Sequence, residues 1–179
     1  DARPTCGLGT GLPSCPLPSC ASGGTTTLSP ENADNSSFSS HAGTIALRLG
    51  KDGDPAFHVR AGVEVRSAGD LTLSENWNLG TSRAGGEPGM LTLRAAGNLN
   101  LDNNLSDGFT VATPFSSGIL PATLSPGDSW GYRLVAGADA DVADQLAVRA
   151  GSGDVTLAAG KLVRTGTGDI RIAAGHDIR

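Results

Sequence analysis

Residues 65–73 read Val-Arg-Ser-Ala-Gly-Asp-Leu-Thr-Leu, and 28 positions later residues 93–101 read Leu-Arg-Ala-Ala-Gly-Asn-Leu-Asn-Leu. Two further copies, each one residue longer, occupy residues 148–157 and 163–172. Every copy has an apolar residue, an arginine, small residues with glycine, an Asp or Asn, and then an apolar-x-apolar triplet. The last two copies begin 15 residues apart, so the spacing varies while the motif persists. A constant unit with variable spacing indicates a repeat fold whose loops differ in length.

Short alternations of apolar and polar residues also occur outside these copies, for example at residues 45–49, 63–65 and 91–93. Alternation with a period of two predicts a strand that buries one face. Gly, Asp, Asn or Ser interrupts each run after three to five residues, which is typical of turns. We found no apolar pattern with a helical period, so the sequence predicts an all-β fold.

A parallel β-helix, a solenoid of stacked coils, explains the repeated motif and the composition together. Successive coils would stack about 4.8 Å apart, and aliphatic side chains would fill the narrow interior. Such an interior needs few aromatic residues, which make up 4% of this chain. At about 20 to 28 residues per coil, the chain would form about six to eight coils. A β-sandwich also has many short strands, but its strands do not usually share one nine-residue motif, so the β-helix is favoured.

Composition limits the classes of protein to which the chain can belong. Its 179 residues suit a single domain, and its net charge of −5 comes without a basic patch or interleaved aromatics. Nucleic-acid binding is therefore not expected. No apolar stretch approaches the length of a membrane span, and the first ten residues have neither the basic start nor the apolar core of a signal peptide.

Two stretches depart from the repeat pattern. Residues 1–40 are rich in Cys, Pro, Gly and Ser and are expected to be irregular, with the β-helical rod occupying residues 41–179. Within the rod, residues 106–129 contain three prolines and two phenylalanines, which predicts a loop excursion. The sequence also ends inside the pattern, at residues 173–179, without the polar cap of a solenoid end. We therefore expect a fragment of a longer rod.

Three strings carry a resemblance to a known family: residues 91–99, 129–139 and 162–170. They resemble the filamentous haemagglutinin family, which comprises large bacterial exoproteins associated with adhesion or haem utilisation. The resemblance covers residues 42–179 and implies a right-handed β-helical rod that two-partner secretion delivers to the cell surface. The family's secretion domain carries Asn-Pro motifs, and this chain has no Asn-Pro pair. The resemblance therefore implies a segment of the rod beyond that domain.

Acidic residues in the repeats invite comparison with β-helical enzymes that act on polysaccharides, because paired carboxylates can perform acid–base chemistry or hold calcium. Asp70, Asp154 and Asp169 each follow a glycine, where Asp and Asn tolerate positive φ and bond their own backbone. Asn98 occupies the equivalent position without a carboxylate, which favours a turn role over catalysis. Residues 102–104, Asp-Asn-Asn, lack the spaced carboxylates of an EF-hand loop, so no metal site is expected there.

Neither the histidines nor the cysteines have metal-ligand spacing. His41, His58 and His176 are far apart and are expected to be isolated and exposed, although the family's link with haem makes a haem ligand an alternative. The three cysteines, Cys6, Cys15 and Cys20, lack the two-residue spacing of zinc or redox motifs. In an oxidising exterior one disulfide with a leftover thiol is plausible, and the sequence does not tell which pair forms.

Arginines and aromatic residues are the remaining candidates for a binding surface. Four arginines share one position of the repeat and are expected to form a ladder along the rod, mainly as a solvated face and alternatively as a site for acidic glycans: Arg66, Arg94, Arg149 and Arg164. Sugars stack on exposed aromatic rings, but burial is the commoner fate of Trp and Tyr. Trp77, Trp130 and Tyr132 are therefore expected in the core.

The sequence as a whole predicts a non-catalytic rod segment of a secreted, haemagglutinin-like bacterial adhesin at the outer cell surface. Its partners would be a glycan or protein receptor on host or bacterial cells and, for the full-length protein, an outer-membrane transporter. No cofactor, catalytic residue, nucleic acid or membrane insertion is expected. The alternatives are a polysaccharide-cleaving β-helix enzyme and the stalk of a contact-dependent toxin.

Overall fold

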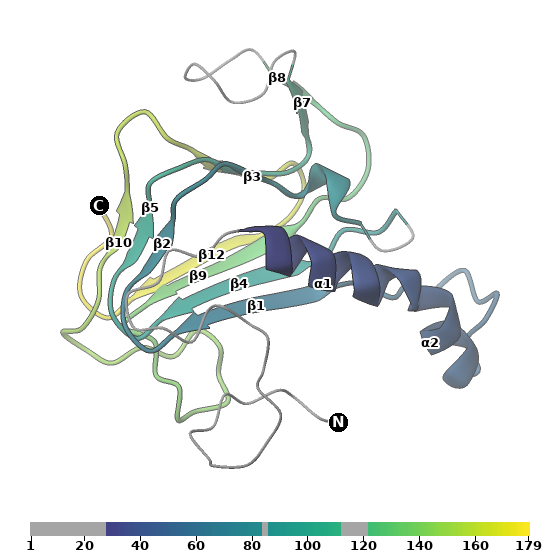
Figure 1. Cartoon of the computed structure of the whole chain (residues 1–179), viewed down its shortest axis with the longest axis horizontal. Coiled ribbons are helices and arrows are strands. Elements are labelled where there is room, and N and C mark those ends of the chain that lie inside the picture. Colours follow the sequence, from purple (N-terminus) through teal and green to yellow (C-terminus); the bar gives the residue numbers. More distant parts are fainter. Residues whose placement is uncertain (1–27, 84–85, 112–121) are drawn as a thin grey trace.

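The fold consists mainly of short parallel strands in three sheets, as a computed structural model of residues 28–83, 86–111 and 122–179 shows (Figure 1). The first sheet contains β1 (Gly62–Ser67), β4 (Met90–Ala95), β9 (Gly131–Ala136) and β12 (Ile170–Ala174). The second contains β2 (Leu71–Leu73), β5 (Leu99–Leu101) and β10 (Val155–Leu157). The third contains β3 (Trp77–Asn78), β6 (Leu105–Ser106) and β11 (Val163–Arg164). This arrangement agrees with the predicted all-β class.

The chain visits the three sheets in the same order each time. It forms β1, β2 and β3, then β4, β5 and β6, and then β9, β10 and β11, before β12 returns to the first sheet. We call each set of three strands a layer. Every strand pairs in parallel with its counterpart in the neighbouring layer. The 28-residue offset of the first two motif copies is also their register, because Val65 lies opposite Leu93 and Leu71 opposite Leu99.

Aliphatic residues from successive layers lie over one another in the interior. Leu71, Leu99 and Val155 are register partners across the second sheet, and their exposed fractions are 5%, 0% and 2%. Ile170, which the motif placed in the same stack, lies instead opposite Tyr132 in the first sheet and is 40% exposed. The predicted stack is therefore confirmed for three of its four members.

The misplaced isoleucine follows from the turn at which its motif copy lies. The copies at residues 65–73 and 93–101 each connect the first sheet to the second. The copy at 163–172 instead connects the third sheet to the first, through β11 and β12. The motif specifies a tight strand–turn–strand unit, but the turn it forms depends on the length of the preceding loop. In the copy at 148–157 only the second half enters a sheet, as β10.

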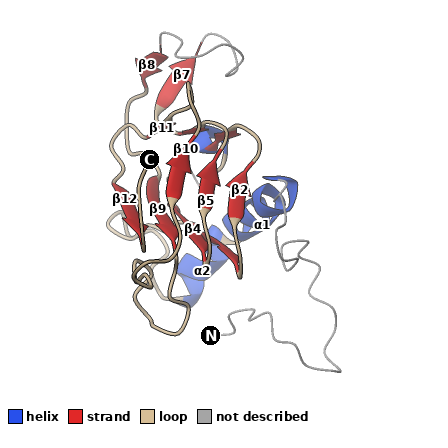
Figure 2. Ribbon diagram, turned by 90° about the vertical axis from the view of Figure 1, so that its left-hand side faces the viewer, coloured by secondary structure: helices blue, strands red, loops and turns tan. Residues whose placement is uncertain are grey.

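Two helices precede the strands: α1 (Leu28–Ser40) and α2 (Ala42–Arg48). The sequence predicted an irregular segment for α1, and the prediction of a strand at residues 45–49 is wrong, because these residues lie in and just after α2 and the first strand begins only at Gly62. Pro30 lies in the first turn of α1, where a proline is tolerated. The described side chains of α1 are mostly polar, and none is buried in α2, so there was no apolar stripe to reveal a helix. Figure 2 shows α1 beyond β2, at the end of the stack opposite β12. None of the described helices is long and apolar enough to cross a membrane.

Two excursions leave the sheets. Residues 107–130 connect β6 to β9 and contain an antiparallel pair, β7 (Phe109–Val111) and β8 (Ala122–Leu124), which projects away from the sheets (Figure 1). Residues 137–154 connect β9 to β10, and the sequence did not predict this second excursion. The structure does not describe residues 1–27, so Cys6, Cys15 and Cys20 lie outside the described residues.

Candidate functional site

Four arginine side chains gather on the outer face of the first sheet. Arg66 and Arg94 are register partners on β1 and β4, and Arg133 and Arg171 are register partners on β9 and β12. Side chains alternate between the two faces of a strand. Since Leu93 and other neighbours of these arginines are buried in the core, the arginines lie on the opposite face. We call the space that they line the arginine cleft.

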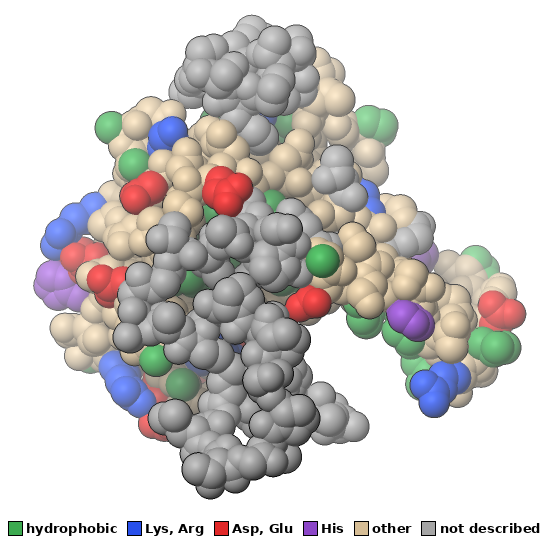
Figure 3. Space-filling model, viewed as in Figure 1, with side chains coloured by type: hydrophobic (Ala, Val, Ile, Leu, Met, Phe, Trp, Pro, Cys, Tyr) green, Lys and Arg blue, Asp and Glu red, His purple; other side chains and the backbone are tan. Residues whose placement is uncertain are grey.

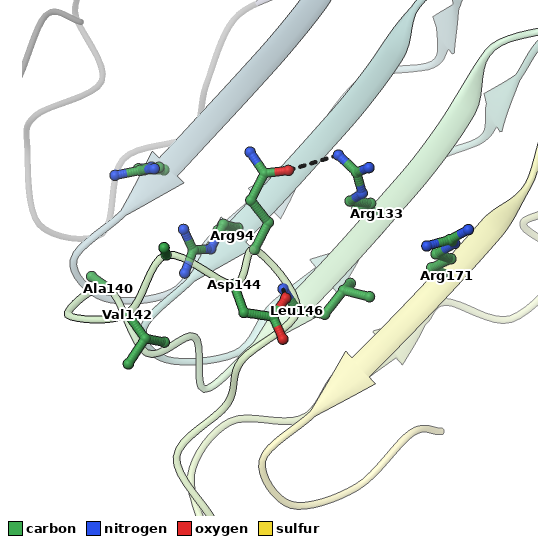
Figure 4. A pocket seen from close by; sticks show the side chains of 10 residues that line it. Arg94, Arg133, Ala140, Val142, Asp144, Leu146 and Arg171 are labelled. Carbon is green, nitrogen blue, oxygen red and sulfur yellow. Dashed lines mark hydrogen bonds between the residues drawn. The ribbon is translucent and has the colours of Figure 1, made fainter.

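The other wall of the arginine cleft is the excursion between β9 and β10. Residues 140 and 142–146 line it, and the cavity has a volume of about 680 Å³ (Figure 4). An antiparallel bridge between Ala138 and Val148 closes the base of this loop. Arg149 then ties the loop to itself, because its Nη2 lies 2.7 Å from Asp141 Oδ2 and 3.3 Å from Asp139 Oδ1. The wall is therefore a closed loop with its own ion pairs.

The arginines on β9 and β12 each have one of their nitrogen atoms engaged. Arg133 Nη1 donates to Gln145 Oε1 at 2.6 Å, across the cleft (Figure 4). Arg171 Nη2 donates to Asp169 Oδ2 at 3.2 Å on the sheet side, and its side chain is 55% exposed. A guanidinium has five N–H donors, so both side chains keep donors for a ligand.

Arg94 is the buried member of the group. Its side chain is 4% exposed, and Figure 4 shows it beneath the loop, close to Ala140 and Val142. Nη2 donates to the Asp139 carbonyl oxygen at 2.7 Å, and Nη1 lies 3.4 Å from Glu64 Oε1. Its Nε is buried without a hydrogen-bond partner. A buried donor without an acceptor costs about 1–3 kcal/mol, so the floor of the cleft carries an unmet hydrogen bond.

The cleft concentrates arginine side chains. Four arginines line it, and three carboxylates lie close to them: Glu64 between Arg66 and Arg94, Asp169 beside Arg171, and Asp144 in the loop wall. This grouping contrasts with the face of the molecule in Figure 3, where acidic and basic side chains are interspersed. The chain as a whole is acidic, so this concentration of arginines is a local feature. The guanidinium donors that Arg133 and Arg171 keep free can bind an anion.

Glu64 shows how the cleft holds a carboxylate. Arg66 donates from Nε and Nη2 to its two oxygens at 2.8 and 3.0 Å, a forked pair. Partial burial alone would raise the pKa of Glu64, but the hydrogen bonds and charge of Arg66, followed by those of Arg94, outweigh it. The pKa of Glu64 is therefore lowered from its ordinary value of 4.5.

This lowered pKa predicts a dependence of stability on pH. The folded state binds the Glu64 proton less tightly than the unfolded state, so the contribution is present above pH 4.5 and disappears as the pH falls through the folded-state pKa. Glu64→Gln should remove about 0.5 kcal/mol of stability at pH 7 and almost none at pH 3. Urea unfolding at both pH values measures the difference. In an Arg66→Met background the effect should shrink, and an unchanged effect there would contradict the assigned cause.

The acidic residues of the repeats form a ladder between layers. Asp70 Oδ1 accepts from the Asn98 backbone N–H at 2.7 Å, Asn98 Oδ1 from Asp154 N–H at 2.9 Å, and Asp154 Oδ1 from Asp177 N–H at 3.0 Å. These side chains do have structural contacts, but the predicted contacts within a turn are wrong. No described non-glycine residue has a positive φ, and each side chain caps the next layer rather than its own backbone. Asp169 is outside this ladder and pairs with Arg171.

The segment at residues 102–104 is part of a similar ladder. Asn104 donates to Asn76 Oδ1 at 2.8 Å and accepts from Leu162 N–H at 3.0 Å, so it links three layers. Asn103 Oδ1 accepts from Lys161 Nζ at 3.2 Å. These asparagine oxygens are engaged by protein donors, which is consistent with a structural role.

The three histidines are far apart and exposed, as predicted, but each has a partner. His41 Nδ1 lies 2.8 Å from the Ser37 carbonyl oxygen, and His58 Nδ1 lies 2.9 Å from Glu87 Oε1. His176 Nδ1 lies 2.7 Å from Asp154 Oδ1. Of these, only His176 belongs to a group of possible metal ligands among the described residues.

That group contains Asp154, His176 and Asp177, with one ligand atom from each within 4.8 Å of the others. The sequence did not reveal it because the layer fold joins positions that are 22 residues apart. Protein partners already engage Asp154: the His176 hydrogen bond lowers its pKa, and the Asp177 N–H and the charge of Arg179 act in the same direction. The group therefore forms an exposed polar cluster that links the last two layers.

The predicted arginine ladder holds for two of its four members. Arg66 and Arg94 are register partners, but Arg149 lies in the loop wall, and Arg164 lies 4.5 Å from the centre of the Phe109 ring. The aromatic residues are buried as predicted, with exposed fractions of 3% for Trp77 and 0% for Trp130 and Tyr132. No aromatic residue is among those that line the arginine cleft.

Comparison with known proteins adds no relative. No family model, curated protein or solved structure matches this chain. The resemblance to the filamentous haemagglutinin family therefore stays a prediction.

The sequence pointed to half of the arginine cleft. Arg133 and Arg171 each lie between apolar residues in an alternating strand, Tyr132-Arg133-Leu134 and Ile170-Arg171-Ile172. This alternation was a sufficient signal for an outward position. The sequence did not indicate that these two arginines lie near Arg66 and Arg94. The strands β4 and β9 pair with an offset of 41 residues and β9 and β12 with an offset of 38, after loops of different length.

Proposed function

We propose that the chain is a segment of a right-handed parallel β-helix and that it presents an attachment surface in a large secreted bacterial adhesin. The observation that carries this proposal is the repeated order of the three sheets, with each strand in parallel register with the next layer. A parallel connection within one sheet is right-handed in nearly all proteins, which supports the proposed handedness. Repetition in one direction suits a rod that holds a surface away from a cell.

The distribution of side chains supports a surface role. Aliphatic residues and the three large aromatic residues fill the interior, including Leu99, Trp130 and Tyr132, each of which is 0% exposed. The arginine cleft lies on the outer face of the first sheet, where a macromolecular partner can reach it. The partner would be a glycan or protein on host or bacterial cells, and two-partner secretion would deliver the full-length protein to the bacterial outer surface.

An attachment assay tests this role. Beads that carry the full chain through a C-terminal tag should bind to cultured epithelial cells or to bacteria in clear excess over albumin-coated beads. Soluble chain should compete, because attachment through a specific surface saturates. Beads that bind neither cell type above the albumin level would overturn the attachment role.

The non-catalytic part of the proposal has its own test. Uronate-containing oligosaccharides incubated with the chain should be recovered intact by mass spectrometry. Shortened or unsaturated products that disappear when the protein is omitted would overturn it and favour the polysaccharide-cleaving alternative.

A further inference from the structure

The unmet hydrogen bond of Arg94 points to a ligand in the arginine cleft. Native proteins satisfy most buried donors, and the Nε of Arg94 is a buried donor without a partner on a side chain that is 4% exposed. Its other two nitrogens hold Glu64 and the Asp139 carbonyl oxygen. These contacts orient the guanidinium. The Nε itself is closed off from the cleft in this structure, so a ligand oxygen reaches it, and supplies the missing acceptor, when residues 140–144 shift outward.

The charge around Arg94 favours an anionic oxygen. Arg133 and Arg171 lie on neighbouring strands, which are about 4.8 Å apart. Each has one nitrogen engaged by a protein oxygen and keeps the others for a ligand. Planar guanidinium groups match a carboxylate through two parallel N–H donors. The forked pair between Arg66 and Glu64 shows this geometry within the same cleft.

The loop wall favours a ligand that also carries hydroxyl groups. Asp144 lines the cavity, and its Oδ1 accepts from the Leu146 N–H at 2.9 Å, which leaves Oδ2 able to accept from a ligand hydroxyl. Gln145 lies beside it. A bare inorganic anion would be repelled by Asp144, whereas a sugar acid can use the arginines and the acceptor together. The apolar side chains of Val142 and Leu146 can contact the C–H face of a sugar ring.

We infer that the arginine cleft binds a carboxylated saccharide, with Arg133, Arg171 and the buried Arg94 as carboxylate donors and Asp144 as the hydroxyl acceptor. The cavity of about 680 Å³ has room for a short oligosaccharide. Recognition is polar rather than aromatic, because Trp77, Trp130 and Tyr132 are buried. The inference rests on the proposed function, since it names the class of ligand for the attachment surface.

A matched pair of oligosaccharides tests the inference on the full chain. The probe is a hyaluronan hexasaccharide, which carries carboxylates and no sulfate, and its partner is the same hexasaccharide with the carboxyl groups reduced to alcohols. Isothermal titration should show about tenfold tighter binding of the carboxylated form, equivalent to about 1.4 kcal/mol. Equal affinities would overturn the inference. So would inorganic sulfate that competes as well as the hexasaccharide, because the site would then recognise any oxyanion.

Variants assign the binding to the cleft. Arg133→Gln and Arg171→Gln remove one positive charge each and should weaken binding about tenfold. Neither arginine holds a buried partner in the core, so both variants should keep the circular dichroism spectrum of the parent chain. Arg60→Gln is the matched control, because Arg60 pairs with Glu87 and Asp128 outside the cleft and should bind like the parent. Binding that survives both cleft substitutions would overturn the inference.

NMR spectroscopy can monitor the buried Nε–H of Arg94 directly. In ¹⁵N-labelled chain, the Nε–H resonance of Arg94, assigned by its loss in Arg94→Lys, should move downfield as the carboxylated hexasaccharide is added. An Nε–H signal that does not move would exclude Arg94 from the site.

The two proposals fail separately. If beads bind cells while the hexasaccharide does not bind the chain, the inferred ligand is wrong and the attachment role stands. If the hexasaccharide binds at the cleft while beads do not bind cells, the attachment role is wrong and the saccharide site stands.

Discussion

Replacing Arg83 with alanine should lower the free energy of unfolding by about 3–5 kcal/mol, the usual cost of leaving one charge of a buried pair without its partner. Arg83 Nη2 donates to both oxygens of Asp107 at 2.9 Å, and the Asp107 side chain is 0% exposed. Asp107 also accepts from the Trp130 N–H at 2.7 Å. The substitution would leave the carboxylate buried with this backbone donor as its main remaining partner.

The loss should also loosen the excursion between β6 and β9. Asp107 follows β6 and Trp130 precedes β9, so the carboxylate joins the two ends of residues 107–130. Arg83 strengthens the junction by donating from Nη1 to the Asp128 carbonyl oxygen at 2.9 Å. We therefore expect faster amide hydrogen exchange at Trp130 and Gly131 in Arg83→Ala than in the parent chain.

Urea unfolding at pH 7 measures the stability change, and two further variants calibrate it. Arg60→Ala breaks an exposed pair with Asp128 and should cost no more than about 1 kcal/mol. Arg83→Lys keeps the charge near Asp107 and should cost less than Arg83→Ala, which keeps the test informative even if the alanine variant does not fold. A cost for Arg83→Ala no larger than that for Arg60→Ala would show that the Asp107 pair does not stabilise the fold.

Arg83 and Asp107 also show what the sequence could not reveal. Neither belongs to the repeated motif, and both lie in stretches where apolar and polar residues do not alternate. Their pairing depends on how residues 79–83, at the end of the first layer, pack against the segment that follows the second. Such contacts between layers depend on loop length, and a local pattern does not encode loop geometry.

The strands of the first two layers, in contrast, could be predicted from the sequence, because the two copies of the motif there have one constant offset. The 28-residue offset between residues 65–73 and 93–101 sets both the strands and their register. Longer excursions precede β9 and β10. After an excursion the local motif still predicts a turn, but it does not identify which two sheets that turn connects. The helices α1 and α2 were missed for a different reason, because they bury no apolar stripe against the sheets.

The candidate site divides in the same way. Arg66 and Arg94 share a position of the motif and were correctly expected side by side. Arg133 and Arg171 lie beside them because β9 pairs with β4 and β12 pairs with β9. The residue offsets of these pairs differ from one another, so the sequence did not predict their register. The loop wall that buries Arg94 comes from the second excursion, which no repeat in the sequence predicted.

Leu99→Ala should lower the free energy of unfolding by about 2–5 kcal/mol, with a value near the upper end. Leu99 is 0% exposed and lies in register between Leu71 and Val155, so it is held from both neighbouring layers. Truncation would leave a cavity in the middle of the stack. The surrounding strands are fixed by parallel pairing on both sides, so they have little freedom to collapse into the space.

Leu157→Ala is the matched control, because it makes the same chemical change in the same sheet. Leu157 lies on β10, opposite Leu101, and is 40% exposed. On its other side the Leu157 N–H donates to the Arg179 carbonyl oxygen at 2.9 Å. Because the side chain is only partly buried, its truncation should cost about 1 kcal/mol or less. Chemical unfolding of both variants under one set of conditions gives the comparison.

The size of the difference bears on the architecture itself. In a stack of layers, the cost of truncation depends on how many layers cover a side chain, so Leu99 should cost several times as much as Leu157. In a structure where the repeated leucines occupied unrelated positions, the two costs would follow no such order. Equal losses for the two variants would therefore remove the physical basis for a continuous interior, and with it the basis for the proposed rod.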